Sequence, residues 1–414
     1  MIDPQPSTGD TDDASNIPVV AGQIGSAREV FFAFLKLGLT SFGGPVAHLG
    51  FFRTEFVDRR RWLDDQSYSD LVALCQFLPG PASSQVGMAL GLLRAGWAGA
   101  LCAWVGFTVP SALLLIAFAY GVAQFDGLAA SGALNGLKAV VVAVVAQAVW
   151  GMGKSLCPDR TRAALAILGA LLCLAVSNTL GPIVAIIACG LAGTRFVRLS
   201  PALVGPSAQY GVSRRAAVSA AIVFLFLLSA LPVVVIASGS SFWALVDGVY
   251  RAGALVFGGG HVVLPLLQTT VVSTGMLDAS SFIAGYGAAQ VVPGPLFTFA
   301  SYLGTVMQGP LSGWVGGLFF LIVIFVPAFL LVVAALPFWD SLRRHEALRQ
   351  AMAGVNAGVV GVLLAALYDP VWTSAIHGRG DVALALAAFA LLVYARWSPV
   401  LVVGLGVAAG ILLG

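Results

Sequence analysis

The length of the apolar runs constrains this chain more than any other feature. Residues 97–120 and 216–239 contain no charged side chain, and each run has the roughly 20 residues that an α-helix needs to cross a bilayer. A membrane β-barrel would instead show strands of about ten residues with alternating polarity. We therefore expect the chain to form membrane-spanning α-helices.

Composition supports the same fold class. Only 9% of the 414 residues are charged and 59% are hydrophobic, whereas about 25% of the residues of a soluble domain are charged. So few charges cannot coat a water-soluble body of this size. At about 20 residues per span, the chain holds roughly 12–14 membrane segments, some of them too short to cross alone. The predicted fold is an all-α polytopic membrane protein.

Charge and cysteine usage exclude several classes of function. The net charge of +3 is spread over loops, whereas a nucleic-acid partner would need a concentrated basic face. The five cysteines form no Cys-x-x-Cys pair, so we expect no metal site and no cofactor. The run 151–155 resembles the end of a phosphate-binding loop, but Ala148 replaces the first glycine of that motif. Without a catalytic motif, the chain is not expected to be an enzyme.

The chain repeats its own motifs in the same order. Phe42-Gly43-Gly44-Pro45 returns as Phe257-Gly258-Gly259-Gly260, and Gln76-Phe77-Leu78-Pro79-Gly80-Pro81 returns as Gln290-Val291-Val292-Pro293-Gly294-Pro295. We predict a disordered tail at 1–27, one repeat at 28–194, a linker with an extra transmembrane segment at 195–242, and a second repeat at 243–414.

Loop charge indicates that the two repeats are inverted. The loop after the first segment carries Arg53, Arg59, Arg60 and Arg61, but its counterpart at 269–281 has no Lys or Arg. The loop at 121–132 has none either, whereas its counterpart holds Arg343, Arg344 and Arg349. By the positive-inside rule, equivalent loops then face opposite sides. Both basic loops can face the cytoplasm only if an even number of spans separates them. This requires that 28–52 and 243–268 are re-entrant or that one span is miscounted.

Four predicted helix breaks mark the candidate binding site. Inverted repeats place substrate near the midplane, where discontinuous helices meet. A helix that begins at Pro81 or Pro295 directs its free amides at the break, which favours an anion. The alternative is that these breaks only kink the helices. The candidate substrate-binding residues at the breaks are Gly43, Gly44, Pro45, Gln76, Pro79, Gly80, Pro81, Ser83, Ser84, Gly258, Gly259, Gln290, Pro293, Gly294, Pro295 and Thr298.

Cations inside apolar segments are the second indication of anion chemistry. Burying a charge in a membrane is costly, so such residues are functional candidates. Lys36 and Arg251 occupy equivalent positions of the two repeats, and Lys138 lies in a run of Val and Ala. Snorkelling is the alternative for Lys36 and Arg251, and Arg251 can also pair with Asp247. We expect Lys138 to bind substrate.

Further candidates for attracting the anion or coupling its movement flank the breaks. Arg53 and Arg94 lie close to them, although each can equally be a positive-inside anchor. His48 and His261 lie near the Gly-Gly motifs and titrate near neutral pH, but they do not occupy matching positions. Carboxylates are scarce inside the segments, which disfavours cation transport.

The motif set resembles the chromate ion transporter (CHR) family of bacteria. The resemblance rests on Phe42 to His48, Trp62-Leu63, Pro79-Gly80-Pro81 and Arg94-Ala95-Gly96, and the run from Phe257 to Pro295 is similar to a second copy. It implies a bidomain, multi-pass protein of the inner membrane that exports chromate, confers chromate resistance and meets sulfate as a competitor. In the second copy, Gly260 replaces the proline after Phe-Gly-Gly, and Leu296-Phe297 follows Pro295.

Transport energetics agree with export of an oxyanion. Moving a charge of −2 outward across about 100 mV, negative inside, yields roughly 4.6 kcal/mol. Membrane potential alone is therefore a sufficient driving force, and proton coupling is permitted. An uptake carrier for sulfate or another oxyanion is the alternative within transport, and a membrane scaffold or integral enzyme is the alternative outside it. The expected partners are chromate, sulfate, the lipid bilayer and a possible homo-oligomer.

Overall fold

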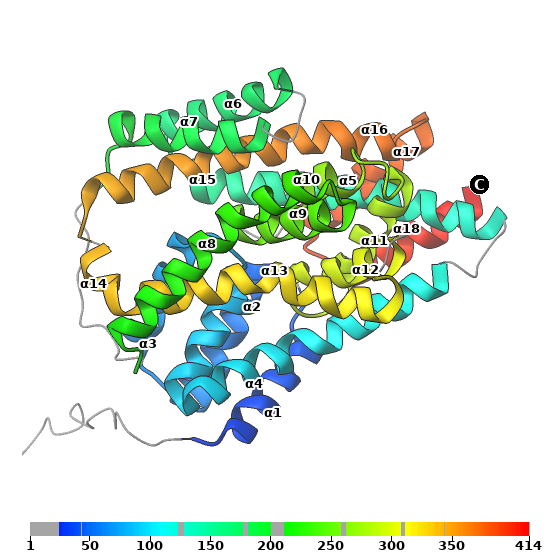
Figure 1. Cartoon of the computed structure of the whole chain (residues 1–414). Helices are drawn as coiled ribbons and strands as arrows, with labels where there is room; N and C mark the ends of the chain where they lie inside the picture. The colour runs from blue at the N-terminus through cyan, green and yellow to red at the C-terminus, as the bar shows by residue number, and fades with distance from the viewer. Residues whose placement is uncertain are drawn as a thin grey trace, which may run out of the picture.

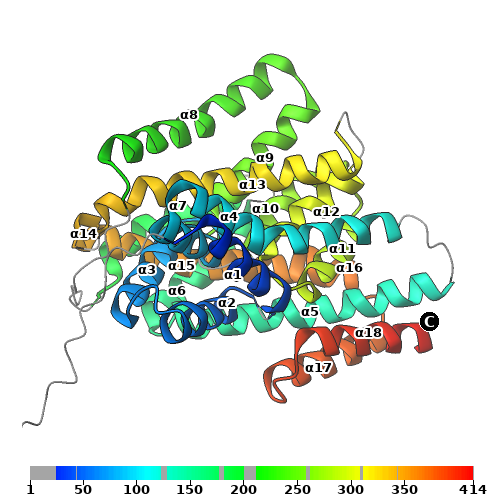
Figure 2. The same ribbon diagram turned by 90° about the horizontal axis from the view of Figure 1, so that it is seen from below.

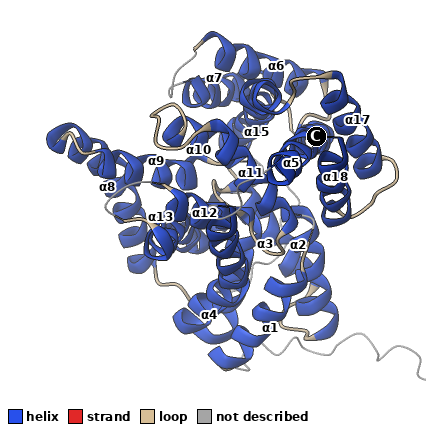
Figure 3. Ribbon diagram, turned by 90° about the vertical axis from the view of Figure 1, so that its right-hand side faces the viewer, coloured by secondary structure: helices blue, strands red, loops and turns tan. Residues whose placement is uncertain are grey.

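The computed structural model describes residues 25–42, 44–122, 128–176, 181–199, 211–257, 262–307, 311–342 and 344–413. These residues form helices and no strand (Figure 3). Most of the predicted tail lies outside this part, as do Gly43, Gly258, Gly259 and His261.

The helices of the first repeat are α1 Ala27–Thr40, α2 Gly44–Arg53, the π-helix η1 Thr54–Arg59, α3 Asp65–Phe77, α4 Ala82–Val122, α5 Leu128–Leu156, α6 Arg160–Ala175 and α7 Gly181–Phe196. The linker forms α8 Arg214–Ser238. The second repeat contains α9 Ser241–Leu255, α10 Val263–Val271, α11 Ala279–Val291, η3 Leu296–Thr298, α12 Phe299–Val306, α13 Gly313–Ala335, η4 Leu336–Phe338, α14 Trp339–Leu342, α15 Glu346–Ala366, η5 Leu367–Trp372, α16 Thr373–Ala375, α17 Arg379–Val393 and α18 Pro399–Leu413.

Helix lengths divide the described chain into spans and half-helices. Five helical segments are long and apolar enough to cross a membrane: 82–121, 132–156, 214–238, 313–342 and 346–375. Many others are shorter than the roughly 20 residues of a span, including α1 with 14 residues and α3 with 13. The all-α membrane fold with broken helices is thereby confirmed. Helix α4 consists of two helices separated by a kink, where Ala95 and Gly96 have non-helical backbone angles.

Helices α1 and α2 form a re-entrant hairpin. Glu55, just after α2, accepts from Lys36 of α1 at 3.4 Å, and Arg60 lies 3.6 Å from Glu29 near the start of α1. The chain therefore enters with α1, turns near Ser41 and returns on the same side. In the second repeat, Thr270 of α10 similarly packs against Gly248 of α9. If 28–52 and 243–268 are re-entrant, the number of spans agrees with a cytoplasmic position of both basic loops.

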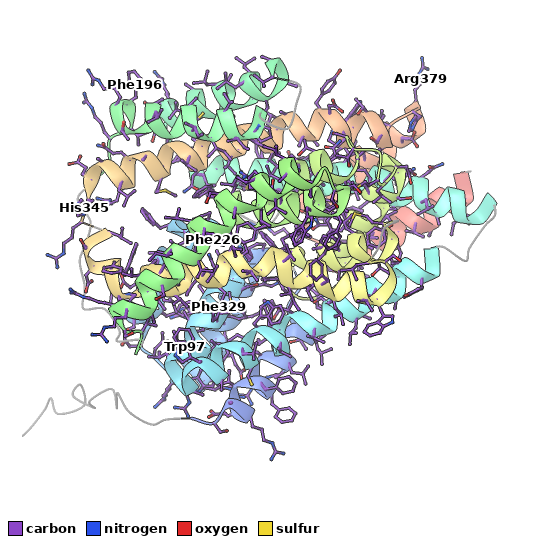
Figure 4. The ribbon with its side chains drawn as sticks, viewed as in Figure 1. Trp97, Phe196, Phe226, Phe329, His345 and Arg379 are labelled. Carbon is purple, nitrogen blue, oxygen red and sulfur yellow. The ribbon has the colours of Figure 1, made fainter. Side chains whose placement is uncertain are left out.

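Equivalent long helices of the two repeats run in opposite directions. The ring of Trp97, near the kink of α4, is tilted against that of Phe329, late in α13, with 6.2 Å between the ring centroids (Figure 4). At the other end of α4, the hydroxyl of Tyr120 accepts from the amide of Trp314, at the start of α13, at 3.0 Å. This antiparallel pairing is the arrangement that inverted repeats require, so the predicted inversion is confirmed.

The two repeats also exchange helices. The long helix α5 packs on α17 and α18 of the other repeat, while α15 packs on α6 and α7 (Figures 1 and 2). Paired glycines permit both crossings. A Cβ atom on Gly410 would lie 2.7 Å from Cα of Gly136, and one on Gly354 would lie 2.7 Å from Cα of Gly193. Small residues at such crossings let membrane helices approach closely.

Basic segments gather at one end of the long helices. Cys157, Val197 and Ala353 pack in one cluster, which brings together the ends of α5 and α7 with the start of α15. Phe196 and His345 lie on the left of Figure 4, whereas Arg379 lies on the right. The adjoining basic residues are Lys154, Arg160, Arg162, Arg195, Arg198, Arg344 and Arg349. By the positive-inside rule we expect this end to face the cytoplasm.

The linker helix α8 lies at the periphery of the molecule (Figure 2). Its apolar side chains are exposed, with Phe226 at 65% and Ile236 at 84% of their full accessible area. A helix of this length and composition is a membrane span, and its exposed apolar face suits lipid.

Candidate functional site

The helix breaks of the two repeats are hydrogen-bonded to each other. The amide of Gly80, in the first Pro-Gly-Pro, donates to the carbonyl of Val256, which precedes the second Phe-Gly-Gly. The amide of Gly294, in the second Pro-Gly-Pro, donates to the carbonyl of Ser41 at 3.0 Å. Ser41 precedes the first Phe-Gly-Gly. The Pro-Gly-Pro of each repeat is therefore bonded to the residue that precedes the Phe-Gly-Gly of the other repeat.

Each Pro-Gly-Pro also rests against the long helix of the opposite repeat. A Cβ atom on Gly80 would lie 3.2 Å from Cβ of Ala328 in α13, and one on Gly294 would collide with Oγ of Ser111 in α4. The Ser111 hydroxyl donates to the carbonyl of Pro293. Gly80 and Gly294 have φ values of 123° and 98°, a conformation that only glycine adopts without strain.

The first repeat supplies a polar pocket wall at the start of α4. Ser83, Ser84 and Gln85 are 2%, 3% and 0% exposed. They begin the helix directly after the break, where the first amides have no partner inside the helix. On α2, His48 is equally buried, and its Nδ1 lies 3.3 Å from Oγ of Ser83. The structure thus brings together Ser83, Ser84 and His48 as predicted residues of one site.

Gln85 is a site residue that the sequence analysis missed. Its Nε2 donates to the carbonyl of Pro79 at 2.8 Å, so the side chain folds back over the break. In the sequence, Gln85 stands out as an amide side chain near the start of an apolar helix. Gln76 is the amide predicted for the site, but it is exposed and is not part of this buried cluster.

Several polar atoms around the first break are buried without a hydrogen-bond partner. Such atoms are rare in native structures, and a group of them indicates a bound molecule or water. Ser84 and Gln85 contribute two of them, His48 adds Nε2, and the turn at Ser41 adds its hydroxyl. The set near the break is Ser41 Oγ, His48 Nε2, Ser84 Oγ, Gln85 Oε1 and Thr108 Oγ1. Most of these groups can donate, which suits an oxyanion.

Bulky aromatic side chains follow the second break, at the positions where polar side chains follow the first. Phe297 and Phe299 are fully buried where the first repeat has Ser83 and Gln85. The hydroxyl of Thr298 donates to the carbonyl of its own Pro295 at 2.7 Å. Gln290 hydrogen-bonds the hydroxyl of Tyr286. The predicted equivalence of the two breaks therefore holds for their backbone and not for their side chains.

The cations near the first hairpin are paired. Glu55, 5% exposed, accepts from Lys36 at 3.4 Å, from Arg59 at 3.2 Å and from Arg60 at 2.7 Å. Burial alone would raise the pKa of Glu55, but the Arg60 hydrogen bond and the three positive charges outweigh it and lower the pKa. The sequence analysis missed Glu55 because it lies next to a basic loop.

The two predicted flanking arginines are also held by carboxylates. Arg53 contacts Asp65 at 2.6 Å and Asp58 at 3.2 Å, and the Asp65 hydrogen bond raises its pKa. Arg94, beside the kink of α4, contacts Glu29 at 3.2 Å. These contacts tie the α2 region to α3 and the kink of α4 to the start of α1.

Arg251 and Lys138 differ in their surroundings. Arg251 donates to Asp247 at 2.8 Å and to the carbonyl of Leu228 in α8 at 2.9 Å, which ties the linker helix to α9. Lys138 is 9% exposed in α5, and its nearest recorded charge is Asp278, at the start of α11. Lys138 therefore interacts with the second repeat.

The larger cavity lies elsewhere. It has a volume of about 390 Å³ between α6, α10 and α15, and its polar lining includes Gln268, Thr269, Ser273 and Asp369. A carboxylate in its wall disfavours an anion. A second cavity of about 200 Å³ between α4 and α13 is lined by apolar side chains such as Leu101 and Phe329.

Comparison with known proteins gives a consistent result. The family model described as Chromate transporter matches residues 28–194 and 243–411. A chromate transport protein of Pseudomonas aeruginosa is 32% identical over 354 residues, which are 83% of this chain and 81% of that protein. One of Cupriavidus metallidurans is 27% identical over 82% of this chain and 81% of that protein. An uncharacterized transporter of Methanocaldococcus jannaschii is 26% identical over 82% and 83%. No solved structure gives a significant match.

Proposed function

Since this chain belongs to the chromate transporter family, we propose that it is a secondary transporter that exports chromate across the bacterial inner membrane and so confers chromate resistance. The observation that carries the proposal is the cluster of unpartnered, buried polar atoms at the first Pro-Gly-Pro, beside the start of α4. A helix N-terminus stabilises an anion through its free amides and its dipole.

The substrate site in this proposal is built by the first repeat. The break at Pro79, Gly80 and Pro81 supplies the helix start, and Ser83, Ser84 and His48 surround it. The second Pro-Gly-Pro bonds through Gly294 to Ser41 of the first hairpin, and the first Pro-Gly-Pro bonds through Gly80 to Val256 of the second repeat. Gly44 and Pro45 open α2, the element that carries His48.

The path of the anion follows from the charges. Basic residues at one end of the long helices attract anions from the cytoplasm, and the half-helices lead to the break. Lys138, buried in the first half of α5, offers a second cation. Outward movement of a charge of −2 across about 100 mV yields roughly 4.6 kcal/mol, about three decades of concentration. Membrane potential is thus the proposed driving force, with proton coupling as an addition.

Everted membrane vesicles test this function directly. Energised vesicles that carry the protein are expected to accumulate chromate, and sulfate, which has the same charge and tetrahedral shape, is expected to compete. Matched vesicles without the protein are the control. Absence of uptake in tightly sealed vesicles would refute transport. In whole cells an exporter lowers chromate accumulation, so raised accumulation would instead support an uptake carrier.

A further inference from the structure

One buried atom at the first break is a hydrogen-bond acceptor, and a fully deprotonated oxyanion has no donor to offer it. Nε2 of Gln85 faces the carbonyl of Pro79 at 2.8 Å. A carbonyl only accepts hydrogen bonds, so the amide nitrogen must be the atom that faces it. The other atom of the amide is then the oxygen, and Oε1 of Gln85 is buried without a partner. The site therefore contains a hydrogen-bond acceptor of known orientation.

Gln85 directly follows Ser84 in the chain, at the start of the helix after the first break. The Gln85 amide folds over the break because of its bond to Pro79, and the side chain is 0% exposed. The hydroxyl of Ser84 next to it is also unpartnered. The ring of His48 contacts Oγ of Ser83 through Nδ1 and also hydrogen-bonds the backbone of Ser41, and it adds a donor to the site in the tautomer that carries the proton on Nε2. The arrangement is several donors and one acceptor.

A tetrahedral oxyanion that keeps one proton matches this pattern. A fully deprotonated anion offers only acceptor oxygens, so it leaves Oε1 of Gln85 desolvated and facing a negative charge, which costs binding free energy. A monoprotonated oxyanion donates its O–H to Oε1 and accepts from the surrounding donors. Chromate forms such a monoprotonated ion near neutral pH. Sulfate and selenate, which have the same charge and shape, hold a proton only in strong acid.

We infer that the site takes the monoprotonated oxyanion, hydrogen chromate, and that Gln85 is the residue that selects it over sulfate and selenate. This inference rests on the proposed transport of chromate, and because hydrogen chromate carries one negative charge, the membrane potential supplies half the driving force per ion that a charge of −2 would receive. Shape and charge alone make sulfate a competitor, and the Gln85 acceptor makes it a weak one. Phe299, which has no such acceptor, stands at the equivalent position of the second repeat.

Few titratable protein groups lie near the site, so a pH effect that they cause can be distinguished from one caused by protonation of the substrate. His48 on α2 is the titratable side chain in contact with the site through Ser83. On the neighbouring elements of the described chain, Lys36 of α1 and Glu55 of η1 are paired with each other. On α13, the recorded neighbour of the break is the apolar Ala328. Titration of His48 is therefore the competing explanation for a pH effect.

Equilibrium binding of labelled chromate to the purified full-length protein in detergent, between pH 6 and 8, tests the inference without a driving force. Affinity for total chromate is expected to fall with rising pH in parallel with the fraction of hydrogen chromate. The same profile is expected for His48→Gln. Selenate should compete weakly with the wild type, and about tenfold better with Gln85→Met, because one charged hydrogen bond is worth about that factor. Ser301→Ala, which removes a buried hydroxyl bonded to the carbonyl of Thr298, is the matched control.

The outcomes separate the two proposals. If the wild type binds chromate with no pH dependence, or binds selenate as tightly as chromate, hydrogen chromate is not the ligand while chromate transport stands. If the pH dependence disappears in His48→Gln, the histidine titrates and the inference is overturned. If the protein neither binds nor transports chromate at any pH, the proposed function itself fails. The wild-type measurements decide the matter even when Gln85→Met does not fold.

Discussion

The amide of Gly294 donates a hydrogen bond to the carbonyl of Ser41, a residue of the opposite repeat, at 3.0 Å. Gly80 makes the equivalent bond to Val256. Because each break is fixed by the other repeat, neither repeat can form its site alone. The following predictions test this coupling and the site that it supports.

Gly294→Ala is expected to destabilise the protein by at least about 2 kcal/mol and to abolish transport. The φ of 98° is strained for alanine, and the added Cβ collides with Oγ of Ser111. Thermal unfolding in detergent measures the effect. Gly96→Ala is the control, because Gly96 also has a positive φ but no atom within 4 Å of an added Cβ. Equal losses of stability in both variants would show that backbone strain, and not the collision with Ser111, causes the effect.

Ser84→Ala is expected to raise KM for chromate about tenfold with little change in stability. The hydroxyl is buried and unpartnered in the absence of ligand, so its loss removes a hydrogen bond to a charged substrate and nothing else. Concentration-dependent uptake in vesicles gives KM. Thr305→Val removes a hydroxyl that is also buried but bonded to the carbonyl of Ser301. An unchanged KM in Ser84→Ala would remove this serine from the site.

Lys138→Ala is expected to lower the rate of transport at least about tenfold, while Lys138→Arg keeps most of it. The side chain supplies a positive charge inside an apolar helix, and arginine preserves that charge. Initial uptake rates, normalised to the amount of protein in the membrane, provide the measurement. Full activity of Lys138→Ala would mean that the lysine serves only its neighbour Asp278.

Exchange of helices between the repeats predicts that Gly136→Val and Gly354→Val are equally harmful. Each substitution places side-chain atoms where a helix of the other repeat passes, at Gly410 or at Gly193. Overpacking of this kind costs about 1–3 kcal/mol. Thermal unfolding is again the measurement, and Gly153→Val, on an open face of α5, is the control. Tolerance of both substitutions would contradict the crossed packing.

Acid is expected to weaken the hairpin of α1 and α2 through Glu55. Its pKa is lowered in the folded protein from an ordinary value of 4.5, so its contribution to stability is complete above that pH and is lost as the pH falls through the lowered pKa. Glu55→Gln should lower stability at neutral pH by about 2 kcal/mol and flatten the loss below pH 4.5. Thermal unfolding at several pH values tests this. An unchanged acid profile in Glu55→Gln would mean that other carboxylates dominate.

Much of the architecture follows from local pattern. Apolar runs identify membrane helices because lipid rewards them wherever they occur in the chain. The breaks at Pro79 to Pro81 and Pro293 to Pro295 are also local, since proline and glycine interrupt a helix through their own backbone chemistry. Loop charge indicated inversion for the same reason.

Side-chain roles were less predictable. Lys36 and Arg251 occupy equivalent positions and looked equivalent, yet one pairs with Glu55 from a returning helix and the other with Asp247 on its own helix. Gln76 precedes the break and is exposed, whereas Gln85 follows it and is buried. A pattern of residue types does not specify which face of a half-helix meets its neighbour.

The sequence by itself determined the membrane environment, the two repeats, their inversion and the positions of the helix breaks, because each depends on residues close together in the chain. The tertiary structure alone decided that the Pro-Gly-Pro of each repeat is bonded to the other repeat, and that buried polar atoms without a partner gather, within the described residues, around the first break. Those properties arise from contacts between distant residues, such as Ser41 with Gly294 and His48 with Ser83. Such contacts exist only after the two repeats have packed together.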